Sequence, residues 1–273
     1  MNLQKPHSIK NIILFFLIAV ATTITAQKQQ LSPQVSTFTI NAPQLQTTKK
    51  IWLYLPKSYA VSNKKYSVIY MHDAQNLFDT KASYAGEWNV DEKLDSLQAQ
   101  LIVVGIEHGN EKRMEELTPF KNDKYGGGKA DEYLDFIVTT LKPHIDSTYR
   151  TKIAAKNTII TGSSLGGLVS FYATLKYPKV FGKAGVFSPS FWFSNEIYNY
   201  TQSQNKIRSK IYFMCGDKES DDMVTDLNKM ETLINSKRCY CLNLNEKKIV
   251  KGGQHNEKLW RDGFVQAIQW LKY

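Results

Sequence analysis

Short apolar runs alternate with amphipathic stretches along most of the chain. The runs rich in β-branched and aromatic residues are Ile51–Leu55, Ser67–Met71, Leu101–Ile106, Thr158–Thr161, Lys183–Phe187 and Lys210–Cys215. Runs of this length and composition are typical of buried β-strands. We therefore predict six strands in these ranges, with a further β-like run at residues 241–250, ahead of the last helix.

From the third of these runs onward, the strands alternate with apolar residues at helical spacing. The helical positions are Val90, Leu94 and Leu97; Tyr133, Phe136, Ile137 and Leu141; Met223, Leu227, Met230, Leu233 and Ile234; and Trp260, Phe264, Ala267, Ile268 and Leu271. Continuously apolar strands between amphipathic helices indicate an α/β fold with a mostly parallel central sheet and helices on both faces. The first strands have no helix between them, which predicts an antiparallel start to the sheet.

The first 26 residues differ from the rest of the chain. Lys5 and Lys10 precede the apolar run at residues 11–21, and Ala26 closes a candidate cleavage site. The apolar run is shorter than the ~20 residues that a membrane-spanning helix needs. We therefore interpret residues 1–26 as a secretory signal peptide rather than an anchor, and residues 27–273 as one periplasmic or secreted domain without a stable membrane span after cleavage.

Composition narrows the possible partners. Cleavage would remove two lysines and no acidic residue, which lowers the formal net charge from +10 to +8. The lysines are scattered and no arginine-rich run occurs, so we expect no nucleic-acid partner. No metal or nucleotide motif such as HExxH, CxxC or a P-loop is present, so we expect neither a metal nor a cofactor. The three cysteines give no disulfide framework.

A candidate nucleophile follows the run Thr158–Thr161. The sequence "GSSLG" at residues 162–166 fits the pattern G-x-S-x-G, with Ser164 at its centre and a helical pattern after it. Small residues on both sides permit the strained strand-to-helix turn that exposes a catalytic serine. An ordinary glycine- and serine-rich turn is the alternative, but the strand before and the helix after favour the nucleophile.

A serine nucleophile needs a base and an acid, which follow it in the order serine, acid, histidine in this kind of fold. Of the five histidines, His255 is the one that follows Ser164. The candidate acids after the strand Lys210–Cys215 are Asp217, Glu219, Asp221 and Asp222. The last two suit the first turn of the next helix, which leaves the first two as candidates for orienting His255.

The remaining parts of such a site are an oxyanion hole and a substrate surface. The backbone N–H of Leu165, directly after the candidate nucleophile, supplies one oxyanion donor, and the loop Asp73–Asn76 supplies the other. Trp88 lies between polar residues, ahead of a helix whose apolar face begins at Val90. We therefore expect Trp88 to present its ring to the substrate.

Longer segments carry a family resemblance. The segments are "YMHDAQNLFD", "EWNVDEKLD", "IVVGIEHGNEKRMEELTPF", "GSSLGGLVSFYATLKYPKVFGKAGVFSPSFWF", "CGDKES" and "GGQHNEKLWRDGF". Over roughly residues 35–273 the chain resembles the esterase-D-like esterases of the α/β-hydrolase superfamily, which include siderophore esterases, feruloyl and acetyl-xylan esterases, and mycolyltransferases. The resemblance implies an α/β-hydrolase fold.

The same resemblance implies roles for individual residues. It makes Ser164 the nucleophile, His255 the base and Glu219 the acid, and it makes the amides of Gln75 and Leu165 the oxyanion donors. Ala74 departs from the family pattern, because many relatives have glycine there.

We therefore expect a serine hydrolase that cleaves carboxylic esters through an acyl-enzyme intermediate. Its expected substrates are small-molecule or carbohydrate esters, with short acyl or aryl-acyl groups on sugars or siderophore-like molecules. An acyltransferase with the same residues and a non-catalytic binding protein on a hydrolase scaffold are the alternatives.

Overall fold

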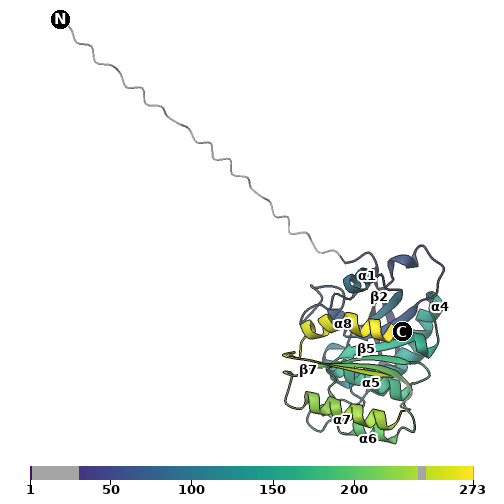
Figure 1. Ribbon diagram of the computed structural model, residues 1–273. Coiled ribbons are helices and arrows are strands. Elements are labelled where there is room, and N and C mark those ends of the chain that lie inside the picture. The colour runs from purple at the N-terminus through teal and green to yellow at the C-terminus, as the bar shows by residue number, and fades with distance from the viewer. Residues whose placement is uncertain (2–30, 239–243, 273) are drawn as a thin grey trace. The chain divides into compact units, whose positions relative to one another are not determined.

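The computed structural model describes residue 1, residues 31–238 and residues 244–272 (Figure 1). Apart from Met1, the predicted signal peptide lies outside these ranges, as do Cys239, Cys241 and the first residues of the last β-like run. Among the helices within these ranges, none is both long enough and apolar enough to cross a membrane. Residues 31–273 form one compact unit.

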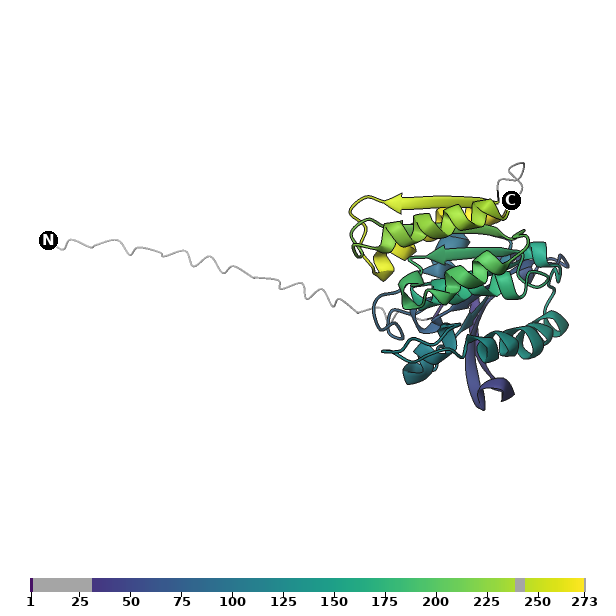
Figure 2. The ribbon, with the colours of Figure 1, turned by 90° about the horizontal axis from the view of Figure 1, so that it is seen from below.

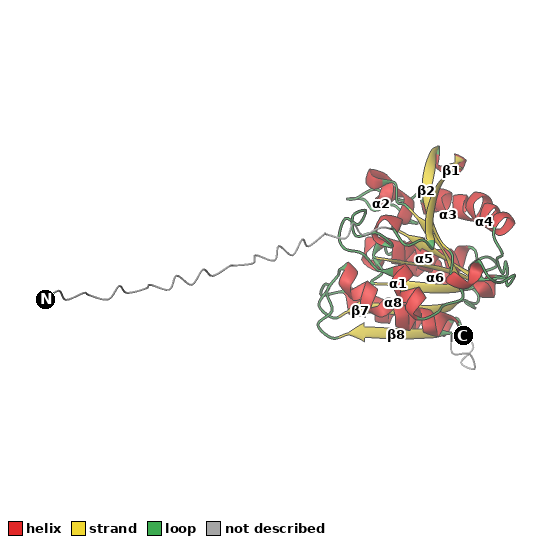
Figure 3. Cartoon of the chain, turned by 90° about the horizontal axis from the view of Figure 1, so that it is seen from above, coloured by secondary structure: helices red, strands yellow, loops and turns green. Residues whose placement is uncertain are grey.

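The centre of this unit is an eight-stranded sheet. Its strands are β1 (Val35–Ala42), β2 (Thr47–Tyr54), β3 (Ser67–His72), β4 (Leu101–Ile106), β5 (Thr158–Ser163), β6 (Lys183–Phe187), β7 (Lys210–Gly216) and β8 (Asn245–Val250). Their order in the sheet is β1-β2-β4-β3-β5-β6-β7-β8. Figure 3 shows β1 and β2 at one edge and β8 at the other.

The direction of the strands agrees with the prediction. Strand β1 pairs antiparallel with β2, and β2 pairs antiparallel with β4, whereas the pairs from β4 through β3 to β8 are all parallel. All six predicted strands are present, and those at Leu101–Ile106 and Lys183–Phe187 have the predicted bounds. Strand β1 was not predicted. It is an edge strand whose residues between the first and the last are at least partly exposed, so it lacks a continuous apolar run.

Helices cover both faces of the sheet, as Figures 2 and 3 show. They are α1 (Val90–Ser96), α2 (Arg113–Leu117), α3 (Ala130–Asp135), α4 (Lys142–Thr148), α5 (Leu165–Lys176), α6 (Glu196–Ser203), α7 (Met223–Ser236) and α8 (Glu257–Lys272). A π-helical segment, Phe136–Leu141, joins α3 to α4.

Two separate apolar clusters lie on the two faces of the sheet, one on each face. Residues of α3, α5, α6 and α7 belong to one cluster, together with Ile160 of β5. Residues of α1 and α8 belong to the other, together with Ile159 of the same strand. Successive residues of a strand point to opposite faces, so the sheet is buried on both sides. The predicted fold class is therefore confirmed.

This architecture determines where a site can form. Strands β3 to β8 run parallel, so their carboxyl ends lie along one edge of the sheet. Ligands of open α/β sheets bind in the crevice at that edge. The loops that follow β3, β5, β7 and β8 carry residues 73–76, Ser164, residues 217–222 and residues 251–256, which include every predicted triad residue.

Candidate active site

Ser164 occupies a sharp turn between β5 and α5. Its backbone has φ 57° and ψ −121°, a conformation that an L-residue adopts at a cost of about 1–3 kcal/mol. Three backbone hydrogen bonds hold the turn: the Ser164 N–H donates to the carbonyl of Phe187 at 3.0 Å, and the Ser164 carbonyl accepts from Leu168 at 3.0 Å and from Ser190 at 3.1 Å. The turn exposes Ser164 partly, whereas Ser163 is buried.

The glycines around Ser164 are required by close packing. A Cβ on Gly162 would lie 2.9 Å from the carbonyl carbon of Gly166, and a Cβ on Gly167 would lie 2.7 Å from the carbonyl oxygen of Phe187. Real Cβ atoms do not approach backbone atoms this closely. Gly162, the first glycine of the G-x-S-x-G pattern, and Gly167, directly after the pattern, therefore have a steric reason, because α5 starts directly against the end of β5. At Gly166, the second glycine of the pattern, a Cβ would lie 3.3 Å from side-chain atoms of Asp73 and His72.

Glu219 and His255 are in contact. The Nδ1 atom of His255 lies 2.6 Å from Oε2 of Glu219, and the Glu219 side chain is 1% exposed against 36% for His255. The other oxygen of Glu219 accepts from the Ser188 hydroxyl at 2.7 Å and from the backbone N–H of Gly216. A carboxylate held by three donors is fixed in one orientation.

Asp217, the other candidate acid, has a different partner. Its Oδ1 accepts from the backbone N–H of Gly252 at 2.6 Å, so it fastens the loop that leads to His255. The Asp217 N–H also donates to Val250, and the Lys218 N–H donates to Gly253. Because β7 and β8 are neighbours, these bonds join the acid-bearing loop to the histidine-bearing loop.

A tryptophan and a second serine support the pair. The Trp260 indole N–H donates to the Ser188 hydroxyl at 2.7 Å, which in turn donates to Glu219. The Trp260 ring also meets the His255 imidazole edge-on, with centroids 5.0 Å apart. Ser188 is fully buried. Ser188 was not among the predicted site residues, although the "SPS" segment directly after β6 was an available signal.

Ser164 and His255 line the same cavity, which has a volume of about 680 Å³. In this structure the Ser164 hydroxyl is 3.2 Å from the hydroxyl of Ser190, and no hydrogen bond among the described residues joins it to His255. Gln75, Asp73 and Arg113 contribute to the same wall. The structure thus brings the predicted nucleophile, base and oxyanion loop to one cavity.

The backbone donors of the predicted oxyanion hole are available. Gln75 lies in the 3₁₀ turn Ala74–Asn76 after β3, and Leu165 is the first residue of α5. Neither N–H donates to another group within the residues that the structure describes. The Gln75 side chain exchanges two hydrogen bonds with the backbone of His108, at 3.3 and 3.4 Å, which fixes the turn against the loop after β4.

An ion pair between a buried carboxylate and a half-buried guanidinium holds the residue before this turn. Asp73 has φ 57°, and its carboxylate accepts two hydrogen bonds from Arg113, at 2.7 and 2.8 Å. Burial raises the pKa of Asp73, but the Arg113 guanidinium outweighs it, so the pKa lies below its usual value. Asp73 therefore stays ionised, and the pair braces the oxyanion loop.

His72, next to this pair, is buried beneath the same loop. Its Nδ1 lies 2.8 Å from the Tyr133 hydroxyl, and burial lowers its pKa to about 4. This histidine is therefore neutral at pH 7 and belongs to the packing of the site.

The prediction for Trp88 is wrong. Trp88 is 3% exposed and does not line the cavity; its ring packs against Phe187, Trp260 and Phe264 in the cluster under α8. Its polar neighbours suggested exposure, but Glu87 is itself buried. The exposed aromatic residue Tyr84 lines the cavity instead; Trp192, also exposed, follows Ser190 by two residues but is not part of the lining.

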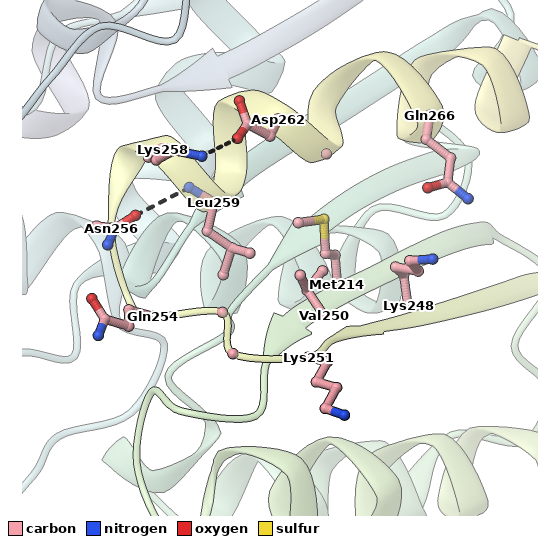
Figure 4. Close-up of a pocket in the computed structure, with 13 residues that line it drawn as sticks. Met214, Lys248, Val250, Lys251, Gln254, Asn256, Lys258, Leu259, Asp262 and Gln266 are labelled. Atoms are coloured by element: carbon pink, nitrogen blue, oxygen red, sulfur yellow. Dashed lines mark hydrogen bonds and ion pairs between the residues drawn. The ribbon is translucent and has the colours of Figure 1, made fainter.

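A second cavity, of about 500 Å³, lies between β8 and α8 (Figure 4). Met214 and Leu259 contribute apolar side chains to it, and Lys248 and Gln266 contribute polar ones. Its lining includes Gln254 and Asn256, the neighbours of His255, but not His255 itself. The cavity that contains Ser164 is therefore the candidate active site.

The sheet order, the strained serine after β5 and the acid–histidine pair after β7 and β8 define the class: the protein has an α/β-hydrolase fold. Residues 42–271 match the family described as "Putative esterase". The chain belongs to this family, which confirms the resemblance and places the protein among the carboxylic ester hydrolases.

Individual proteins are similar to the chain in sequence or in fold. The chain is 28% identical over 239 residues to the uncharacterized protein YbbA of Bacillus subtilis, covering 82% of this chain and 92% of that protein. It is 27% identical over 205 residues to an endo-1,4-beta-xylanase/feruloyl esterase of Xylanibacter ruminicola, covering 69% and 25%. The enterobactin esterase FES of Shigella flexneri shares the fold, with a TM-score of 0.73 at 17% identity over 89% of this chain and 60% of that one.

Proposed function

We propose that this protein is a serine esterase that cleaves carboxylic esters through an acyl-enzyme intermediate on Ser164. One observation carries the proposal: a serine in a strained turn shares a cavity with a histidine whose second ring nitrogen is held by a buried carboxylate. This arrangement is the general requirement for activating a hydroxyl nucleophile.

Acylation follows from the positions of the groups. The Ser164 hydroxyl rotates from Ser190 toward His255, a change between staggered side-chain rotamers. Nε2 of His255 then accepts the hydroxyl proton while Oγ attacks the ester carbonyl. Glu219 holds Nδ1–H, which keeps Nε2 as the acceptor and stabilises the imidazolium. The imidazolium then gives the proton to the leaving alcohol.

The oxyanion of the tetrahedral intermediate binds at the backbone N–H groups of Gln75 and Leu165. Neither has another acceptor in the part of the chain that the structure describes. The Asp73–Arg113 pair and the His108 backbone hold the Gln75 turn in place before substrate arrives. Donors fixed in advance stabilise a developing charge without reorganisation. Water, activated by His255, then attacks the acyl-enzyme in the reverse sequence and releases the acid.

For the substrate, we propose short acyl or aryl-acyl esters of sugars or siderophore-like molecules. The observation that favours flat or ring-shaped groups is the side chain of Tyr84, which lines the cavity and is 96% exposed. Trp192, 54% exposed with Tyr125 edge-on at 5.9 Å, follows Ser190, the hydrogen-bond partner of Ser164, by two residues. Aromatic faces bind planar acyl groups and sugar rings. Two of the similar proteins, a feruloyl esterase and an enterobactin esterase, agree with this class.

A panel of esters tests both the proposed serine mechanism and the proposed substrate class. Purified protein beginning at Gln27 is assayed against acetyl, feruloyl and long-chain acyl esters of the same alcohol, with Ser164→Ala as the control. We expect hydrolysis of the acetyl or feruloyl ester, and none by the variant. Faster turnover of the long-chain ester would contradict the proposed substrate class, whereas undiminished turnover by Ser164→Ala would contradict the mechanism.

A further inference from the structure

Three carboxylates converge beside the active-site loop. Glu87 precedes α1, and Asp91 and Glu92 lie in its first turn. One oxygen atom from each lies within 4.8 Å of the other two. Oxygen ligands of Ca²⁺ lie 2.3–2.6 Å from the ion, so two ligands on opposite sides are about 5 Å apart. The three oxygens therefore fit around one ion of this size.

Two of these carboxylates are buried and incompletely hydrogen-bonded. Glu87 is 4% exposed and Asp91 is 3% exposed. The Thr80 hydroxyl donates to Oε2 of Glu87, but Oε1 of Glu87 and Oδ1 of Asp91 have no hydrogen-bond partner within the described residues and no contact with solvent. A buried carboxylate oxygen that accepts no hydrogen bond lowers the stability of the fold, so a bound ligand that contacts both oxygens would stabilise the protein.

The basic side chain of Arg261 offsets the charge of this cluster only in part. Arg261 donates to the backbone carbonyl of Glu87 at 3.2 Å, and its Nε lies 3.7 Å from the carboxylate of Asp262. Burial first, and then the adjacent Glu92, raise the pKa of Asp91 to about 7, and burial also raises the pKa of Glu87. The Thr80 hydroxyl and Arg261 lower the pKa of Glu87, and a backbone N–H lowers that of Asp91, but burial and the neighbouring carboxylates outweigh them. A bound cation would relieve this remaining repulsion.

We propose that Glu87, Asp91 and Glu92 bind a Ca²⁺ ion, with water completing its coordination. All donors are carboxylate oxygens, which Ca²⁺ prefers, and its flexible coordination tolerates one ligand from a loop and two from a helix. Mg²⁺ requires shorter bonds in near-ideal octahedral geometry and suits this set less well. The binding site does not depend on the esterase activity, so the two proposals fail separately.

The site is connected to the oxyanion loop. The backbone N–H of Trp88 donates to Asn76 at 2.8 Å, and that of Val90 donates to Leu77 at 3.0 Å. The Asn76 side chain accepts from the backbone N–H of Tyr84 at 3.1 Å. An ion held at residues 87–92 therefore fixes the segment that carries Gln75 and Tyr84 into the cavity.

Calcium binding is tested on purified protein that has been treated with EGTA and exchanged into chelator-free buffer. Midpoints of thermal unfolding are measured with and without CaCl₂, and Tb³⁺ luminescence sensitised by tryptophan is measured with and without competing Ca²⁺. With a Kd of about 0.1–1 mM, 10 mM CaCl₂ raises Tm by about 3–10 °C. Trp88 directly follows Glu87 in the sequence, so it is the tryptophan that we expect to sensitise bound Tb³⁺.

Variants separate this site from non-specific binding. Asp91→Asn removes a buried ligand and Glu92→Gln removes an exposed one that folding does not need; Glu132→Gln, an exposed acid on α3, is the matched control. We expect the calcium-dependent rise in Tm to disappear in Asp91→Asn, to fall at least by half in Glu92→Gln and to persist in the control. No rise in the parent protein, or an equal rise in all variants, overturns the proposal. If Asp91→Asn is more stable than the parent without calcium, and calcium does not raise the Tm of the parent, the proposal is wrong. Asp91 and Glu92 would then share a proton instead of binding an ion.

Discussion

Replacing Glu219 by glutamine tests how the imidazole is held. Oε1 of Glu219 accepts from Gly216 and Ser188, so a glutamine carbonyl stays on these donors and its NH₂ group faces His255. Two donors then oppose each other at Nδ1 unless the imidazole proton moves to Nε2. In that tautomer Nε2 cannot accept the proton of Ser164. We expect kcat/KM to fall about 10⁴-fold, equivalent to about 5.5 kcal/mol of transition-state stabilisation.

The assay is the hydrolysis of a short-chain aryl ester, with circular dichroism to confirm folding. Asp217→Asn is the matched control, since asparagine keeps a carbonyl that accepts from Gly252 at the same position. We expect its kcat/KM to stay within a few-fold of the parent value. A loss below 10-fold for Glu219→Gln, or a larger loss for Asp217→Asn, would refute the assignment of the acid.

Three further predictions concern other parts of the chain. Trp88→Ala should lower the free energy of unfolding by about 3–5 kcal/mol in urea titrations, because the Trp88 side chain is 3% exposed. Trp192→Ala is the control: Trp192 is 54% exposed, so its loss should lower the free energy of unfolding by less than about 1 kcal/mol. Equal effects of the two changes would contradict the placement of Trp88 in the core. Burial lowers the pKa of His72 to about 4 from 6.5, so the unfolded chain binds more protons between these values. Stability should therefore fall by up to about 3 kcal/mol as the pH drops from 6.5 to 4, and His72→Gln should show a shallower pH dependence; an unchanged slope would argue against this. We also propose that the protein is exported and cleaved after Ala26, so intact-mass analysis of the exported form should show Gln27 as its first residue, and a mass that retains residues 1–26 would favour an anchor.

The inner strands could be predicted because burial on both faces leaves continuous apolar runs. The run Leu101–Ile106 became β4 with all six residues buried. The edge is different: β2 begins at Thr47, four residues before the predicted run, because its polar start is held by pairing with β1 rather than by burial. Such edge pairing leaves little trace in the hydrophobic pattern.

The site was predictable where chain order constrained it. His255 followed from the order of the triad. The residue types alone left Asp217 and Glu219 open, and the family resemblance implied Glu219, which is the acid in contact with His255. The loops after β7 and β8 decide this by how they pack together, which the residue types do not show. The error at Trp88 has a related cause. A buried acid at position 87 looks like an exposed one in the sequence, so the burial of the segment could not be inferred.

Covalent labelling by a fluorophosphonate tests the central claim most directly, because it reports the activated nucleophile without any knowledge of the substrate. The probe is incubated with the parent protein and with Ser164→Ala, Ser163→Ala and Glu219→Gln, and the modified residue is identified by peptide mass spectrometry. We predict one adduct on Ser164, absent from Ser164→Ala, retained in Ser163→Ala and formed much more slowly in Glu219→Gln. An adduct on Ser163, or a protein that hydrolyses esters yet is not labelled at Ser164, would contradict the account.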